Sequence, residues 1–290
     1  MSKSSVINLF YHPKMAYLNF DSESKSMFKC KPLYDNYLSK DSRFKLNAFN
    51  KLQKDSYLLA HTKDYANNIL NQSNTFSESV EYQCSSLYSS IESSITTPEI
   101  IGVSPSAGFH HAMPDQGMGF CVFSGQVIAS TLIYKNYKLS GSYIDLDAHY
   151  GNSIEDSRKM FPILNTYIPK LANINPTGKN SKYIQNFKDK LDILSKLIKT
   201  DKIHYIVYCH GADSIITDNM HAGKLTEYNW FKCTEIFCDW LYNLEKELNK
   251  SIPLSVSLFG GYRDNINEIC ELHYKDICLM LNHFKIKNKI

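Results

Sequence analysis

Two carboxylates and an imidazole follow a hydrophobic segment near the middle of the chain. Asp145, Asp147 and His149 lie two residues apart in "YIDLDAH", residues 143–149. Alternate residues of a β-strand share one face, so this spacing predicts that the three side chains point in the same direction. Such a group is unfavourable in a hydrophobic core and well suited to a cation. The segment therefore predicts a metal site at the end of a buried strand.

Asp213 offers a further metal ligand, because it follows another apolar segment in "HGAD", residues 210–213. Asp147, His149 and Asp213 would supply two carboxylates and one imidazole and leave a fourth position for water, which is the arrangement of a catalytic zinc. The alternative is a set of loop carboxylates that cap helices. The position of the motif at the end of a buried strand favours the metal site.

Two histidines and a tyrosine could add acid and base chemistry. His110 and His111 lie in the glycine-rich segment "SAGFHHAMPDQGMGF", residues 106–120. In such a loop both rings can reach one cavity and exchange protons near neutral pH. Tyr262 follows two glycines, and its hydroxyl could donate a hydrogen bond to a developing oxyanion. Either feature alone is more often incidental.

Strands and helices that alternate along the chain must position these residues. Segments rich in β-branched and aromatic residues predict strands, and segments of helical periodicity predict helices, one of them with Thr226 as its N-cap. Residues 62–100 are expected to hold helix and a surface loop. The predicted strands are 6–11, 142–146, 204–208 and 254–259, and the predicted helices are 125–137, 183–199 and 227–249. This alternation predicts an α/β fold: a single domain over residues 1–290 with a mainly parallel central sheet and helices on both faces. The polar clusters then meet at one sheet edge if their strands are neighbours.

Charge and composition argue against several classes of protein. Lysine and arginine number 32 against 29 acidic residues, a formal charge of +3, and no dense basic run with aromatic residues predicts nucleic-acid binding. The apolar run in the opening "MSKSSVINLFYHPK" is too short for a signal peptide or a membrane span, so we expect a soluble, cytoplasmic protein. The eight cysteines are scattered without a C-x-x-C pair, which predicts free thiols.

Taken in order, the motifs resemble the zinc-dependent histone deacetylases and their bacterial amidohydrolase relatives. The resemblance rests on "GFHHAMPDQGMGFC" at 108–121, "DLDAHYGN" at 145–152, "GAD" at 211–213 with Asp218 following, and "GGY" at 260–262. The "HTKDY" at 61–65 also resembles an early segment of the family. Within the family, D-L-D-A-H-x-G-N and the short G-G-Y look most like the class IV enzymes. The resemblance implies the arginase/deacetylase fold.

The same resemblance implies a role for each matching residue. It makes Asp147, His149 and Asp213 the ligands of one zinc ion, and His110 and His111 the paired histidines beside the zinc-bound water. Asp145 becomes the partner of His110 beside a structural potassium site, and Asn152 becomes the partner of His111. The resemblance also makes Tyr262 the residue that polarises the scissile carbonyl, and Gly119 and Phe120 the lining of an acyl-lysine tunnel. The opposite wall is expected from "NINPTG" at 173–178.

Three positions depart from the family pattern. Asn152 is neutral where many members have Asp, so we expect His111 to stay largely unprotonated at pH 7 and to suit a general base. Tyr150 stands where many members have a second histidine. His210 stands where a small or apolar residue is usual, and we interpret it as a packed residue behind the site, with contact to metal or ligand as the alternative.

The predicted reaction is hydrolysis of an N-acyl amide, with an acyl-lysine side chain of a protein or peptide as substrate. Acetylated polyamines and non-catalytic acyl-lysine binding are the alternatives. Ureohydrolases, which bridge two manganese ions through D-A-H-x-D, lack a match here because Tyr150 and Gly151 follow His149. Small residues at 108, 112 and 119 should leave volume around Phe120, which together with the class IV likeness predicts some tolerance for acyl chains longer than acetyl.

Overall fold

A parallel β-sheet forms the centre of the computed structural model, which describes residues 3–4, 6–18, 25–72 and 74–287. Within these residues the sheet has seven strands in the order β2-β1-β3-β7-β6-β4-β5, and every pairing is parallel. The strands are β1 (Ile7–Leu9), β2 (Phe44–Leu46), β3 (Ile101–Ser104), β4 (Gly141–Asp145), β5 (Asn173–Ile174), β6 (Tyr205–Gly211) and β7 (Leu254–Phe259). The predicted α/β fold with a mainly parallel sheet is confirmed. Residues 1, 2 and 5 of the opening segment lie outside the described residues.

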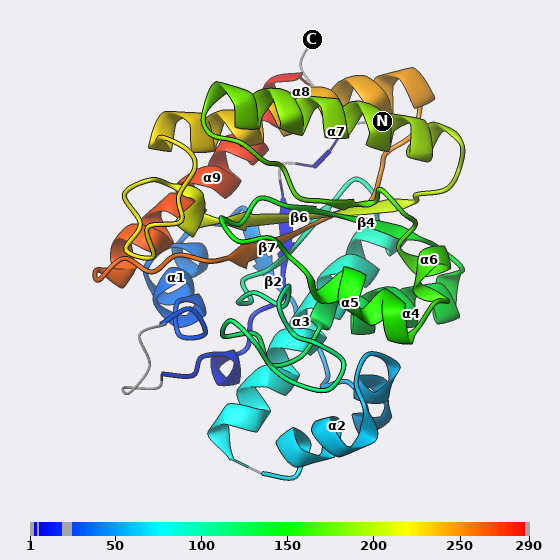
Figure 1. Ribbon diagram of the computed structural model, residues 1–290. Coiled ribbons are helices and arrows are strands. Elements are labelled where there is room, and N and C mark those ends of the chain that lie inside the picture. The colour runs from blue at the N-terminus through cyan, green and yellow to red at the C-terminus, as the bar shows by residue number, and fades with distance from the viewer. Residues whose placement is uncertain (1–2, 5, 19–24, 73, 288–290) are drawn as a thin grey trace.

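Helices cover both faces of the sheet (Figure 1). On one side lie α7 (Ser181–Lys199), α8 (Glu227–Leu248) and α9 (Ile266–Lys287), with α1 (Cys30–Asn36) packed against α9. On the other side lie α3 (Thr75–Thr96), α4 (Gly125–Tyr137), α5 (Ser153–Met160) and α6 (Leu164–Tyr167), and α2 (Lys63–Leu70) lies beside α3. Single turns of 3-10 helix form η1 (Pro13–Met15), η2 (Leu38–Lys40), η3 (Lys54–Leu59) and η4 (Ala212–Ser214).

Local sequence accounts for these elements. The central strands β6 and β7 are buried along their whole length, as strands covered on both faces are, which explains why they carry mostly apolar residues and, in β7, the small Ser255 and Ser257. Along α7 the buried residues recur at helical spacing: Tyr183, Phe187, Leu191, Leu194 and Ile198. The predicted N-cap of α8 is confirmed, since the Thr226 side chain accepts a hydrogen bond from the Asn229 backbone N–H.

The helix expected within residues 62–100 is confirmed by α2 and α3, and the exposed connection between them is only a few residues long. Helix α3 occupies 22 of these residues and packs against the sheet with a face of buried serines. Their hydroxyls are satisfied, because Ser86 Oγ lies 2.7 Å from Ser104 Oγ and Ser90 Oγ lies 2.6 Å from Ser255 Oγ. Small side chains let the helix approach the strands closely. The polar composition of α3 thus gave no sign of its burial against the sheet.

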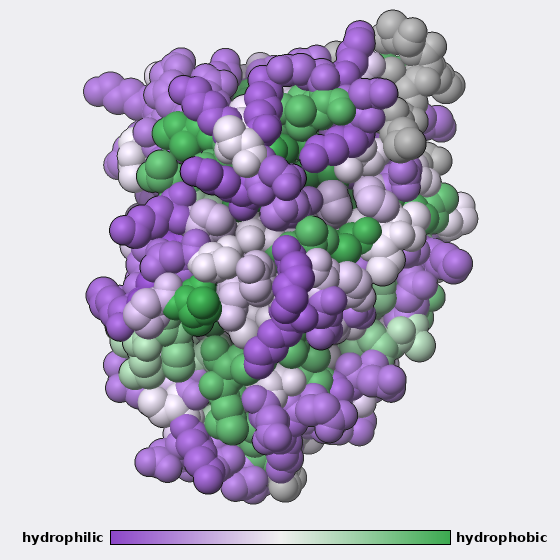
Figure 2. All heavy atoms as spheres, turned by 90° about the vertical axis from the view of Figure 1, so that its right-hand side faces the viewer, coloured by the Kyte–Doolittle hydropathy of each residue, from purple (hydrophilic) through white to green (hydrophobic). Residues whose placement is uncertain are grey.

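The outer surface and the thiols agree with the expectations from composition. Hydrophilic side chains predominate on the face that forms the right-hand side of Figure 1, with smaller groups of hydrophobic ones between them (Figure 2). All eight cysteines are free, and seven of them are buried. No helix within the described ranges is long and apolar enough to cross a membrane.

Candidate active site

The strand order brings the predicted site residues to one edge of the sheet. The strands β3, β7, β6 and β4 are consecutive neighbours in the sheet. The loop after β3 carries His110 and His111, and the loop after β7 carries Tyr262. Asp213 follows β6, and Asp147 and His149 follow β4. Because these strands are neighbours, the polar clusters meet at one sheet edge, as predicted. Residues more than 150 positions apart in the chain meet because parallel strands end at the same edge.

The prediction that Asp145, Asp147 and His149 share one face of a strand is wrong. β4 ends at Asp145, so Asp147 and His149 lie in the following turn and do not share a strand face. The turn is held by side-chain to backbone hydrogen bonds: Asp147 N–H donates to Asp145 Oδ1 at 3.2 Å, and His149 N–H donates to Asp147 Oδ1 at 2.9 Å. Such aspartate turns compete with the strand and end it.

Asp147, His149 and Asp213 form a group that could hold a metal ion. One ligand atom from each of them lies within 4.8 Å of the others. His149 Nδ1 is 3.1 Å from Asp147 Oδ1 and 3.0 Å from Asp213 Oδ2, and both carboxylates are buried. The structure thus assembles the three residues predicted as ligands.

The electrostatics of this group fit a cation. Burial and the neighbouring Asp147 carboxylate raise the pKa of Asp213 to about 7. Two buried carboxylates this close repel each other, and a divalent ion would remove that cost. Glycine at 260 allows the close approach, because a Cβ there would collide with the Asp213 carboxylate, and its φ of 48° suits glycine.

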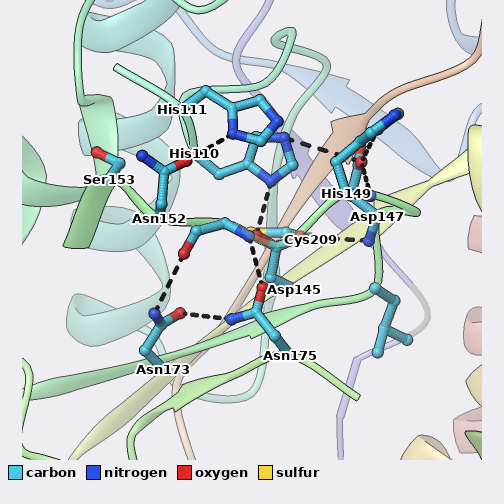
Figure 3. A network of polar contacts seen from close by, with 12 residues as sticks. His110, His111, Asp145, Asp147, His149, Asn152, Ser153, Asn173, Asn175 and Cys209 are labelled. Atoms are coloured by element: carbon cyan, nitrogen blue, oxygen red, sulfur yellow. Dashed lines mark hydrogen bonds and ion pairs between the residues drawn. The ribbon is translucent and has the colours of Figure 1, made fainter. Parts of the chain in front are cut away.

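Asp145 contacts His110 instead of joining the metal ligands. The Nδ1 atom of His110 lies 2.8 Å from Asp145 Oδ2, while its Nε2 atom lies 3.8 Å from Asp147 Oδ1 (Figure 3). Burial lowers the pKa of His110, but the charges of Asp145 and Asp147 outweigh it and raise the pKa to about 9. The predicted pairing of His110 with Asp145 is present.

His111 is oriented by a chain of two hydrogen bonds. Its Nδ1 lies 2.8 Å from Asn152 Oδ1 (Figure 3). Asn152 Nδ2 in turn donates to Asp156 Oδ2 at 2.7 Å. A carboxylate can only accept, so Asp156 turns the amide oxygen of Asn152 toward His111. The ring must then carry its proton on Nδ1, which leaves the lone pair of Nε2 free.

The protonation of His111 agrees with the expectation for a neutral partner. Burial and the charge of His110 lower the pKa of His111, and the hydrogen bond that His111 donates to Asn152 offsets them only in part. The two histidine rings are 4.1 Å apart. The carboxylates thus favour a proton on His110, while the surroundings of His111 disfavour one.

Tyr262 lies at the rim of this group, half-buried, with its ring 5.9 Å from the ring of Phe120. Burial, together with the Asp147 and Asp213 carboxylates, raises the pKa of Tyr262 far above its ordinary value. The hydroxyl therefore keeps its proton and can act as a hydrogen-bond donor.

Lys29 belongs to the same region and was missed in the sequence. Its side chain is 1% exposed, and Nζ donates to the Gly260 carbonyl at 2.5 Å. Burial lowers the pKa of Lys29 to about 8, although the Asp147 and Asp213 carboxylates oppose this. A lysine in a charged stretch near the start of α1 gives no sequence signal of burial, so only the fold reveals it.

Gly119 packs against His111, and the ring of Phe120 lies beside that of Tyr262, so both residues border the site. A Cβ on Gly119 would lie 2.5 Å from His111 Cδ2, so the ring of His111 already fills that space. Phe120 is 44% exposed and has a φ of 62°, an uncommon conformation for a residue with a side chain. The cavity bordered by Phe120, Met27 and Val80 is only about 10 Å³.

Two further predicted segments support the site. His61 Nε2 accepts a hydrogen bond from Ser124 N–H, and Tyr65 donates to the Val122 carbonyl, so "HTKDY" anchors the loop that carries Phe120. Asn175 Oδ1 accepts from Gly151 N–H at 2.8 Å, and Asn175 Nδ2 donates to Asn173 (Figure 3). The side-chain amides of Asn173 and Asn175 are thus hydrogen-bonded to each other, and that of Asn175 also holds the Gly151 backbone next to Asn152.

His210 is a packed residue, as interpreted, and its ring turns away from the metal ligands. It stacks on Trp230 of α8 with centroids 3.9 Å apart, and its Nδ1 lies 2.7 Å from Asp276 Oδ2 of α9. Thr234 donates to the other oxygen of Asp276 at 2.5 Å. This buried network fastens α8 and α9 to β6 immediately before Asp213.

We therefore expect Asp276→Ala to lower stability. The change leaves His210 and Thr234 buried without their acceptor, which should cost about 3 kcal/mol of unfolding free energy. Urea unfolding monitored by circular dichroism measures it, and Glu271→Ala, on the exposed side of α9, should change stability little. Unchanged stability with lost metal binding would instead make the His210 pair part of the metal site.

Comparisons with known proteins agree with this geometry. The family model of the Histone deacetylase domain matches residues 25–162. A probable histone deacetylase 1-A of Xenopus laevis is 29% identical over 184 residues, which cover 56% of this chain and 36% of that protein. Human histone deacetylase 1 is 27% identical over 183 residues, 56% of this chain and 35% of that protein. The matched region thus spans about a third of these curated relatives.

Solved structures of histone deacetylase homologues share the fold. The crystal structure of the HDA15 HD domain has a TM-score of 0.70 at 13% identity and covers 96% of this chain and 89% of that one. An HDAC homolog complexed with SAHA has a TM-score of 0.69 at 14% identity and covers 96% and 84%. The fold is therefore that of these histone deacetylase homologues. Over the matched domain, the chain is similar to the histone deacetylase family.

Proposed function

We propose that this chain is a zinc-dependent hydrolase that removes acyl groups from lysine side chains, with residues 1–290 acting as one catalytic domain. The observation that carries the proposal is the convergence of three metal-binding side chains with a histidine pair and a tyrosine at one sheet edge. The likeness to class IV enzymes and the structural potassium beside Asp145 are finer parts of the same proposal.

Asp147, His149 and Asp213 would hold the metal. Two carboxylates and an imidazole match the ligands of catalytic zinc sites. A zinc ion there would act as a Lewis acid on the amide carbonyl and provide a nucleophilic water at neutral pH. Within the described residues, the group identified as able to hold a metal offers three ligands, which favours one ion over the two manganese ions of a ureohydrolase.

The chain's own side chains would move the protons. His111, neutral and with its Nε2 lone pair free, takes the proton from the attacking water. Tyr262 donates its hydroxyl hydrogen bond to the oxyanion that develops on the carbonyl oxygen. The amide C–N bond then breaks, and a histidine of the pair returns the proton to the leaving lysine nitrogen. Gly119 and Phe120 would flank the lysine side chain.

Substrate comparison tests the proposal and the acyl length. The experiment is kcat/KM for one peptide carrying acetyl, butyryl, octanoyl or myristoyl lysine, with an acetylated polyamine in parallel. Because the residues at 108, 112 and 119 are small, we expect activity on acetyl-lysine and only a gradual fall as the chain lengthens. High myristoyl activity would mean that the wall around Phe120 moves aside. Activity confined to the polyamine would overturn the lysine assignment.

A further inference from the structure

Asp218 links the loop after β6 to the backbone of Tyr262. Its side chain is 1% exposed, and Oδ2 accepts a hydrogen bond from the Tyr262 backbone N–H at 2.8 Å. The other oxygen, Oδ1, accepts from Met220 N–H at 3.1 Å. Asp218 lies five residues beyond Asp213, so one short segment begins at a metal ligand and ends on the tyrosine.

The backbone before Tyr262 needs such an external contact. Gly260 and Gly261 have φ values of 48° and 96°, and two consecutive glycines give this segment an unusually wide choice of conformations. The segment is held at two points. Lys29 donates to the Gly260 carbonyl, and Asp218 accepts from the Tyr262 N–H. Because the second contact is made by the backbone of Tyr262 itself, it restricts the position of the Cα atom from which the tyrosine side chain extends.

A second contact joins the same two loops. Arg263 Nη2 donates to Thr217 Oγ1 at 2.9 Å, so the residue before Asp218 is paired with the residue after Tyr262. A hydrogen bond to a carboxylate is shorter and stronger than one between neutral groups. Of these two contacts, the one from Asp218 acts on the tyrosine directly.

We propose that Asp218 is a positioning residue for the Tyr262 hydroxyl. By fixing the Tyr262 backbone relative to the segment that starts at Asp213, it sets the distance between the oxyanion donor and the metal ligands. The inference rests on the proposed role of Tyr262. Asp218 touches no substrate in this scheme, so its removal should impair turnover more than substrate binding.

The test combines Asp218→Ala and Asp218→Asn with Tyr262→Phe. Asp218→Ala should lower kcat by about tenfold to a hundredfold, as small misplacements of catalytic groups do, with KM changed by less than about threefold. Asp218→Asn keeps one acceptor oxygen and should fall between Ala and wild type. In the Tyr262→Phe background, Asp218→Ala should change kcat by less than about twofold, because the hydroxyl that it positions is gone.

Hydrogen exchange gives a readout that is independent of activity. The amide of Tyr262 should exchange faster in Asp218→Ala, while zinc content stays that of wild type. Glu245→Gln is the matched control, because Glu245 is a buried acid that accepts the Ile252 backbone N–H at 2.7 Å away from this loop. It should leave kcat and the exchange of the Tyr262 amide unchanged.

Three outcomes would overturn the inference. An unchanged kcat in both Asp218 variants would show that the tyrosine needs no such contact. Equal losses in wild type and in Tyr262→Phe would show that Asp218 acts on something else, and would leave the proposed function intact. Tyr262→Phe with activity close to wild type would remove the role of Tyr262, and with it both the inference and that part of the proposed mechanism.

Discussion

Asp213→Ala is expected to abolish metal binding and to lower acyl-lysine hydrolysis by at least about a thousandfold, because Lewis-acid stabilisation is worth several kcal/mol. Wild-type protein should hold about one zinc per chain. The sheet should stay folded, since the substitution removes one of two buried carboxylates that repel each other. Elemental analysis and circular dichroism measure both results.

The control is Asp192→Ala, which removes an exposed carboxylate from the outer face of α7. It should leave metal content and activity unchanged. Two tightly bound manganese ions per wild-type chain, both needed for activity, would contradict the mononuclear scheme. Full activity of Asp213→Ala with undiminished zinc would show that the metal binds elsewhere.

Tyr262→Phe is expected to lower kcat by about a hundredfold or more, which is the usual loss for one oxyanion donor. The change removes a hydroxyl and almost no volume, so zinc content and KM should stay near wild type. Steady-state kinetics with an acetyl-lysine peptide provide the measurement. Tyr150→Phe is the matched control, because Tyr150 also lies beside the site but is 57% exposed.

The tyrosine result distinguishes two interpretations of the "GGY" segment. If Tyr262→Phe keeps activity within a few-fold of wild type, the residue is a turn residue and the oxyanion must be stabilised by other groups. A comparable loss in Tyr150→Phe would point to a general disturbance of the rim and not to one donor.

Segments with clear periodicity could be predicted from the sequence. β7 and α4 have the predicted bounds, and α8 begins after the predicted cap. The grouping of Asp147, His149 and Asp213 could also be predicted, because polar residues that follow apolar strands lie where a parallel sheet binds its ligands. In each case local chemistry and the fold favour the same conformation.

Features that depend on tertiary contacts could not be predicted. Helix α3 is polar in composition, and its serines are buried only because other serines on β3 and β7 face them. Lys29 is buried because the Gly260 carbonyl accepts its hydrogen bond from across the fold. The close packing of His111 against Gly119 is another tertiary contact that the sequence does not reveal.

The most direct test of the central claim is mass spectrometry of an acetyl-lysine peptide incubated with the zinc-loaded protein. The account predicts one acetate and one free lysine amine per peptide, no reaction after chelation, and recovery when zinc is added back. It also predicts almost no product with Tyr262→Phe. An intact peptide after long incubation with folded, zinc-loaded wild-type protein, for every acyl chain tested, would contradict the proposal that this site hydrolyses acyl-lysine.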